Sequence, residues 1–284
     1  MPYLNILKLP APCWRTLLPV LLFALAAGLA AGSADSQEPR GERPLLPGLL
    51  GSDDRTVVDA TVWPWSAIGR VNRGTFTRRQ GGHCTGTLVG PRQVLTAAHC
   101  LYTPTTRRFL PPDAVHFLPG YQGGDFLAHG RGVEIVPPPV YRDVATIDAV
   151  ELRHDWAILI LDSDLGIRPI PVEPAATAIG DALAALREAE TLVQAGYSSD
   201  RAHRLTVNSA CRADNPIGTG WLISHDCDAV PGDSGSPLLI GHGGEVRVVG
   251  LHLAVRIAEG QSIFGVALLS GAFAEAVAAL NAAR

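Results

Sequence analysis

The chain has 284 residues, a formal net charge of −4, 18% charged residues and 47% hydrophobic residues. These values suit one globular domain or two packed ones and exclude a largely disordered chain. The pI is near 6.1 and there is no run of like charge, so the sequence lacks the basic surface that nucleic-acid binding requires. Lys8 is the only lysine, which argues against Schiff-base and Ser-Lys catalysis in the folded part.

Residues 1–34 have the pattern of an export signal. They carry two basic residues and no acid, an apolar stretch spans 17–31, and small residues precede Asp35. Pro19 interrupts the apolar stretch, which is shorter than the roughly 20 residues of a membrane span. We therefore predict a signal peptide over 1–34, a secreted or periplasmic protein, and no membrane association after cleavage.

Residues 35–55 form a second N-terminal segment. They are rich in proline, glycine and charge and show no apolar periodicity, which is typical of a leader or propeptide rather than a core. Arg55, followed by Thr56, offers one candidate activation cleavage point, and residues 40–52 offer others. We expect the folded domain to begin near residue 56.

From Val57 onward, short β-branched runs alternate with turn residues. Many short strands at this spacing favour an all-β barrel or sandwich. The predicted strands are residues 86–89, 94–96, 115–118, 133–136 and 157–161, then 192–195, 205–207, 221–223, 237–240, 246–251 and 263–268.

A Pro-rich stretch is predicted to separate two β units. The first unit is 56–165, the linker is 166–180, and the second unit is 181–284. The Ala-rich residues 175–190 suit either a helical turn or an extended linker.

The C-terminus has the pattern of a packed helix. Ser270 is a candidate cap, and Phe273, Val277 and Leu280 fall on one face at helical spacing. We expect this helix to be a packing element of the C-terminal part of the chain.

Removal of the signal peptide also removes Cys13 and leaves an even set of cysteines, which in an oxidising compartment predicts two disulfides. The set is Cys84, Cys100, Cys211 and Cys227. Three connectivities are open, and the sequence-local pairs close the shortest loops. The chain has no C-x-x-C and no histidine pair at ligand spacing, so we expect no metal site.

Three short strings contain the residue types that nucleophilic catalysis needs. They are Leu95-Thr-Ala-Ala-His-Cys100, His154-Asp-Trp-Ala-Ile-Leu159 and Gly232-Asp-Ser-Gly-Ser-Pro237. A serine hydroxyl is a poor nucleophile unless an imidazole takes its proton, and the imidazole needs a buried carboxylate to fix its tautomer. We therefore predict Ser234 as nucleophile, His99 as general base and then acid, and Asp155 as its orienting partner.

The glycines around Ser234 suggest an oxyanion hole, because two backbone N–H groups must point to one place. Gly232 and Ser234 are the candidate donors, and Gly235 allows a sharp turn. An α/β-hydrolase elbow, G-x-S-x-G, would need glycine at Ser236, and its order Ser, Asp, His is the reverse of the order in this chain.

The three strings, their order and the Cys84–Cys100 spacing resemble the chymotrypsin-like serine proteases over roughly 57–280. The resemblance implies two six-stranded antiparallel β-barrels with a C-terminal α-helix, and an active site between the barrels. It further implies protein or peptide substrates, no cofactor, and a monomer.

Within that family the chain is most similar to the bacterial glutamyl endopeptidase branch, through Ser-Gly-Ser-Pro and Gly250-Leu-His252. In that branch the histidine helps to bind an acidic side chain, so His252 is a candidate substrate ligand. Two positions depart from it. Ala229 replaces a hydroxyl residue, and Asp228 stands where trypsins hold the aspartate that selects Arg or Lys, unless a disulfide at Cys227 turns it away. Acidic, basic and small residues therefore all stay open as the preferred substrate side chain.

Asp233 resembles the aspartate that pairs with a new N-terminus when trypsin-like zymogens are cleaved. It awaits such a partner or is satisfied by neighbouring groups.

Two functional alternatives remain, a protease-fold binding protein without turnover and an esterase that uses the same triad. The other histidines are predicted to be surface or structural residues: His83, His116, His129, His154, His203, His225 and His242.

Overall fold

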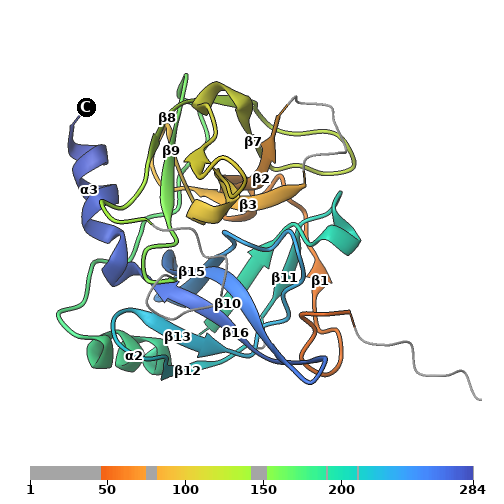
Figure 1. Cartoon of the computed structure of the whole chain (residues 1–284), viewed down its shortest axis with the longest axis vertical. Helices are drawn as coiled ribbons and strands as arrows, with labels where there is room; N and C mark the ends of the chain where they lie inside the picture. The colour runs from red at the N-terminus through yellow and green to blue at the C-terminus, as the bar shows by residue number, and fades with distance from the viewer. Residues whose placement is uncertain (1–45, 75–81, 142–151, 190, 210, 284) are drawn as a thin grey trace, which may run out of the picture. The chain divides into compact units, whose positions relative to one another are not determined.

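The computed structural model describes residues 46–74, 82–141, 152–189, 191–209 and 211–283. These residues form two β units and two α-helices, α2 (Ile179–Glu188) and α3 (Ala274–Ala282) (Figure 1). None of the helices in this part of the chain is long and apolar enough to cross a lipid bilayer. The predicted signal peptide and the first part of the predicted leader lie outside the described residues.

Six antiparallel strands close the first barrel in the order β2-β3-β4-β9-β8-β7. Strand β9 pairs with β4 on one side and β8 on the other, and four of its five residues are buried. This position explains its continuous apolar sequence. A short hairpin, β5 (Tyr102–Thr103) with β6 (Arg108–Phe109), follows β4. The barrel strands are β2 (Ile68–Arg73), β3 (His83–Leu88), β4 (Gln93–Thr96), β7 (Val115–Pro119), β8 (Gly130–Val136) and β9 (Ala157–Leu161).

The second unit is an antiparallel sheet of eight strands in the order β1-β11-β10-β14-β15-β16-β13-β12. Its six inner strands are the six that the sequence predicts, and β1 and β12 are added at the two edges. The predicted chymotrypsin-like β fold with a C-terminal helix is confirmed, but the second unit is an eight-stranded sheet and not the six-stranded barrel that the resemblance implies. The strands are β1 (Thr56–Val57), β10 (Thr191–Gly196), β11 (Thr206–Asn208), β12 (Ala213–Pro216), β13 (Leu222–His225), β14 (Pro237–His242), β15 (Glu245–Ala258) and β16 (Gln261–Leu269).

The predicted linker is fastened to both units by backbone hydrogen bonds. Ile170 N–H donates to the Leu88 carbonyl on β3, and Glu173 N–H donates to the Val248 carbonyl on β15, at 2.9 and 2.8 Å. The Ala-rich residues that suited either a helix or a linker form α2. Its buried residues, such as Leu183, pack on a cluster that includes Leu238 of β14, so this packing decides between the two alternatives.

The C-terminal helix α3 presents the predicted apolar face to the core. Phe273 and Val277 are buried, and Leu280 packs against the same cluster. The predicted cap is wrong, because Ser270 is buried at the start of a 3-10 turn and Phe273 precedes α3 without a side-chain cap. Asn281 Nδ2 donates to a carbonyl of the first barrel, that of residue 89, at 3.1 Å. The helix therefore extends from the second unit onto the first, as Figure 1 shows.

The described part of the predicted leader, residues 46–55, packs on the second sheet. Gly48, Leu49 and Arg55 are buried. The expectation that 35–55 lies outside the core is wrong for these residues, because their backbone and side-chain polar groups have buried partners that the composition does not reveal.

The two disulfides join the sequence-local cysteines. Cys84–Cys100 connects β3 to the turn that follows β4, and Cys211–Cys227 connects the segments that flank β12 and β13. Each closes a sequence separation of 16 residues. Of the three open connectivities, the one with the shortest loops is formed.

We expect Phe273→Ala to lower the free energy of unfolding by about 3–5 kcal/mol, because the fully buried ring would leave a cavity. Urea denaturation followed by circular dichroism measures this. Glu275→Ala, at an exposed position of α3, is the matched control and should change stability by less than about 0.5 kcal/mol. Equal stability of both variants would contradict the packing of α3 on the core.

Candidate active site

Strands β4 and β9 bring the predicted histidine and aspartate together. His99 lies in the 3-10 turn Ala98–Cys100 that follows β4, and Asp155 precedes β9. The strands pair antiparallel with Thr96 opposite Ala157. The end of β4 therefore faces the start of β9, and the two side chains meet there.

The Asp155 carboxylate is fully buried and both of its oxygens face His99. Oδ2 lies 2.7 Å from His99 Nδ1, and Oδ1 accepts the His99 backbone N–H at 2.8 Å. A buried carboxylate in this position keeps a proton on Nδ1, because the opposite tautomer would turn a lone pair toward it. In this tautomer His99 Nε2 carries no proton and can accept one.

Thr85, on β3, fixes the loop that carries Ser234. Its N–H donates to the Ser234 carbonyl at 2.9 Å, and its hydroxyl donates to the Gly232 carbonyl at 3.0 Å. The same hydroxyl accepts the Tyr197 N–H at 2.9 Å. One fully buried side chain thus joins the first barrel to two segments of the second unit.

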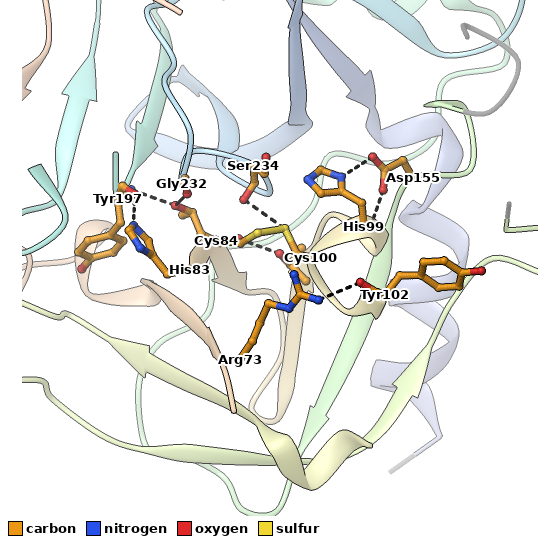
Figure 2. Close-up of a disulfide and its surroundings, with 12 residues drawn as sticks. Arg73, His83, Cys84, His99, Cys100, Tyr102, Asp155, Tyr197, Gly232 and Ser234 are labelled. Atoms are coloured by element: carbon orange, nitrogen blue, oxygen red, sulfur yellow. Dashed lines mark hydrogen bonds and ion pairs between the residues drawn. A yellow bond between two sulfur atoms is a disulfide. The ribbon is translucent and has the colours of Figure 1, made fainter. Parts of the chain in front are cut away.

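The disulfide brings this loop to the histidine. Cys100 directly follows His99, and its sulfur lies 3.7 Å from the Ser234 carbonyl oxygen. Figure 2 shows Ser234 on the side of the His99 ring away from Asp155. Cys84, Cys100 and His99 gather potential ligand atoms within 4.8 Å of one another, but sulfurs joined in a disulfide offer no thiolate to a metal.

Two backbone amides of the loop around Ser234 make no hydrogen bond within the part of the chain that the structure describes. The N–H groups of Asp233, Gly235 and Ser236 donate to carbonyls of the protein. Within the described residues, the N–H groups of Gly232 and Ser234 have no acceptor. Two such amides on one loop are what an oxyanion hole requires.

Gly232 is held in a conformation and a space that suit glycine. Its φ is +103°, and a Cβ there would lie 2.5 Å from the Tyr197 carbonyl oxygen and 2.8 Å from His83 Nε2. His83 Nε2 lies 2.6 Å from the Tyr197 oxygen, and burial lowers the pKa of His83 to about 4. The neutral ring therefore donates to this carbonyl and supports the loop, a structural role as the sequence predicts.

Asp233 is buried and has two donors within the protein. Its Oδ2 accepts the Ser198 hydroxyl at 2.7 Å and the Val230 N–H at 2.9 Å. Burial raises the pKa of Asp233 to about 7 even though both hydrogen bonds favour the carboxylate. In the full-length chain, neighbouring groups therefore donate to one oxygen of Asp233.

His252 forms a buried pair with His225, which sequence analysis treats as surface or structural. His225 Nε2 lies 2.9 Å from His252 Nδ1, and Cys227 N–H donates to His225 Nδ1 at 3.2 Å. Burial lowers the pKa of His225 to about 3 and the pKa of His252 well below its usual value. His252 belongs to the Gly250-Leu-His252 string, but His225 carries no motif of its own. His225 lies on β13 and His252 on β15, and both strands pair with β16. The two histidines therefore come together only once the strand order of the sheet is known.

The other two predicted pocket residues face the N-terminal segment. Both carboxylate oxygens of Asp228 accept backbone N–H groups, from Leu50 at 2.7 Å and from Asp54 at 3.0 Å. Ala229 N–H donates to the Gly48 carbonyl at 2.9 Å. Because both of its oxygens accept backbone N–H groups, the Asp228 carboxylate does not stand free to bind a basic substrate side chain.

This fold, with a histidine and aspartate on one barrel and a serine loop on the other unit, defines a chymotrypsin-like peptidase. Residues 84–251 match the trypsin-like peptidase domain, and the chain belongs to that family.

A segment of 94 residues is 32% identical to a glutamyl endopeptidase of Bacillus licheniformis, covering 33% of this chain and 27% of that protein. The solved structure of a Glu endopeptidase in complex with MPD superposes with a TM-score of 0.62 and 20% identity, over 83% of this chain and 100% of that one. The second likeness supports the fold alone.

We expect Gly232→Ala to lower kcat by about 10²–10³-fold, the usual effect of losing an oxyanion donor, because the loop must move to relieve the contacts with Tyr197 and His83. Steady-state hydrolysis of a peptide substrate measures this. Gly260→Ala is the matched control, since its φ is +77° and a Cβ there meets nothing within 4 Å. A similar loss of kcat in both variants would show that backbone strain alone is responsible.

Proposed function

We propose that this chain is an exported serine endopeptidase that cleaves peptide bonds through an acyl-enzyme. Ser234 is the nucleophile, His99 the general base and acid, and Asp155 its orienting partner. The 2.7 Å contact between His99 Nδ1 and Asp155, next to a loop with two unpaired amides, is the observation that carries the proposal.

In the first half-reaction, Ser234 Oγ attacks the substrate carbonyl carbon while His99 Nε2 takes the hydroxyl proton. Asp155 stabilises the imidazolium, and the N–H groups of Gly232 and Ser234 bind the oxyanion. The imidazolium then protonates the leaving amine as the C–N bond breaks, which leaves an ester on Ser234.

In the second half-reaction a water molecule attacks the ester, and His99 Nε2 takes the proton of the water. The tetrahedral intermediate collapses to the carboxylic acid product, and the imidazolium returns a proton to Ser234 Oγ. The enzyme is regenerated without a metal or an organic cofactor.

We further propose that the enzyme cleaves after acidic residues. Cys227 N–H occupies His225 Nδ1, so the proton of neutral His225 is on Nε2 and points to His252 Nδ1. His252 must then carry its own proton on Nε2, as a donor to a substrate carboxylate. Asp228, with both oxygens engaged, offers no free anion for a basic side chain. The partial sequence match to the Bacillus licheniformis glutamyl endopeptidase supports this preference.

The proposal of export rests on the sequence of residues 1–34. We propose that residues 1–34 are removed as a signal peptide and that the protein acts as a monomer in the periplasm or outside the cell. The two disulfides suit an oxidising compartment.

Ser234→Ala should abolish peptide hydrolysis, with a loss of at least about 10⁴-fold in kcat, and Asp155→Asn should lose about 10⁴-fold because the tautomer of His99 is no longer fixed. Cleavage of a mixed peptide library by the exported form, read by mass spectrometry, measures both the activity and the residue before each cut. Hydrolysis of small esters without peptides would indicate an esterase. No hydrolysis by a folded wild type would indicate a binding protein.

His252→Gln should lower kcat/KM for substrates with glutamate before the scissile bond by about 10–100-fold, the worth of a hydrogen bond to a charged group. Substrates with alanine there should change by less than about threefold, since they make no such bond. Paired peptides that differ only at this residue provide the measurement. Equal losses on both peptides would remove His252 from substrate recognition.

A further inference from the structure

Two histidines of the first barrel lie with their rings side by side. His116 is in β7 and His129 directly precedes β8, the neighbouring antiparallel strand (Figure 1). His116 Nδ1 lies 2.8 Å from His129 Nε2, and the ring planes make an angle of 27° at a centroid distance of 5.0 Å. Neither residue takes part in the proposed catalytic chemistry, so the pair needs a separate explanation.

The strand register brings the two side chains to one face. His116 is opposite Arg131 across the β7–β8 pair, and His129 is two residues before Arg131, so both histidines lie on the same side of the sheet. The neighbours of His116 along β7, Val115 and Phe117, are fully buried in the barrel, so that side is the outer one. His116 is half-buried and His129 is exposed, and an ion from solution can reach both.

The two ring nitrogens are close to the separation of two ligands of one metal ion. Imidazole nitrogens bind Zn²⁺ at about 2.0–2.1 Å, so a tetrahedral site places two of them about 3.3 Å apart. In the hydrogen bond between the rings, one nitrogen donates and the other accepts. When the donor ring carries its proton on its other nitrogen and the rings separate by about half an ångström, both lone pairs point to one ion.

A buried oxygen on the same face lacks a partner. Asn72 of β2 is directly opposite His116 across the β2–β7 pair, which places the two Cβ atoms about 4.5–5.5 Å apart. Asn72 Oδ1 is buried and accepts no hydrogen bond from the residues that the structure describes. Such an acceptor calls for a donor that the protein does not supply. A water molecule held by a metal ion is a donor of this kind.

The charges around the pair favour a cation. Asp113, Asp162 and Arg131 are all close enough to act on the charge of His116. Arg131 is paired with Asp162, since its N–H donates to Oδ1 at 3.1 Å and its Nε lies 3.9 Å from Oδ2. The charge of Asp113 is therefore in excess, and it attracts a positive ion to the pair.

We propose that His116 and His129 bind one divalent transition-metal ion, represented by Zn²⁺, with Asn72 Oδ1 accepting a hydrogen bond from a water molecule on that ion. Imidazole suits zinc, copper and nickel alike, and water fills the other positions. The ion joins β7 to the start of β8 and stabilises the first barrel by its binding free energy.

This site is independent of the proposed function, because none of its residues belongs to the catalytic set. It departs from the sequence-based expectation of no metal site. The two histidines are 13 residues apart in the chain, and only strand pairing brings them together.

Isothermal titration calorimetry with ZnCl₂ tests the site on the exported protein, made without a histidine tag and first treated with EDTA. We expect the wild type to bind one Zn²⁺. His129→Gln, at an exposed position, should keep the fold and weaken binding at least about tenfold, since losing even an outer partner of a metal ligand costs about 10–100-fold. His203→Gln is the matched control, because His203 is also exposed but bonds to Tyr121, and its affinity should equal that of the wild type.

Several results of this titration would overturn the proposal. They are a wild type that binds no Zn²⁺, equal affinity in the wild type and His129→Gln, and loss of binding in His99→Gln but not in His129→Gln, which would make the catalytic imidazole the ligand. Asn72→Ala should weaken binding about tenfold, and an unchanged affinity would overturn the role of Asn72.

Cu²⁺ identifies the ligands directly, because pulsed EPR of the bound ion distinguishes one coordinated imidazole from two. We expect two imidazoles in the wild type and one in both His116→Gln and His129→Gln. One imidazole in the wild type would mean adventitious binding to a single surface histidine and would overturn the proposal.

Thermal unfolding measures the effect of the ion on the barrel. Zn²⁺ at about 100 times its Kd should raise the Tm of the wild type by about 5–10 °C and leave that of His129→Gln nearly unchanged. An equal rise in both proteins would place the stabilising ion elsewhere and contradict the proposal.

Discussion

The attachment of the serine loop to Thr85 is the constraint on which the rest of the site depends. A catalytic histidine and serine on different β units are useful only if the units are fixed to each other within a fraction of an ångström. Thr85 achieves this with its N–H and its hydroxyl, both directed at the loop of Gly232 and Ser234. Its neighbour Cys84 extends the same anchor, through the disulfide with Cys100, to the turn that carries the histidine.

Three aspartates are buried in the described residues, and their partners decide what each can do. Asp155 faces an imidazole and fixes its tautomer. Asp233 accepts a serine hydroxyl and an amide, and its high pKa follows from burial. Asp228 accepts the N–H groups of Leu50 and Asp54. The same type of side chain thus orients a histidine, anchors a loop or anchors the N-terminal segment, because a buried carboxylate must be satisfied and its donors differ in each place.

The strands that the sequence predicted are those with continuous apolar or β-branched runs, such as β9 and β14. It missed β2, with its mixed sequence Ile-Gly-Arg-Val-Asn-Arg, and the edge strand β12, whose Ala-Asp-Asn-Pro reads as a turn. Both gain their order from pairing with a neighbour, which no local pattern records. The sequence left the Ala-rich residues 175–190 undecided between a helix and a linker, because α2 depends on packing against the second sheet.

The sequence by itself determined the fold class and the even set of cysteines, and it predicted three residues with catalytic chemistry. These features depend on local strings and on periodicity, which can be recognised without any knowledge of tertiary contacts. Only the tertiary structure paired His225 with His252, turned Asp228 toward Leu50 and Asp54, and buried Arg55 between Asp53 and Asp200. Each of these depends on groups that are distant in sequence or on burial, and the energy of a polar or charged side chain is set by the partners it meets in the fold.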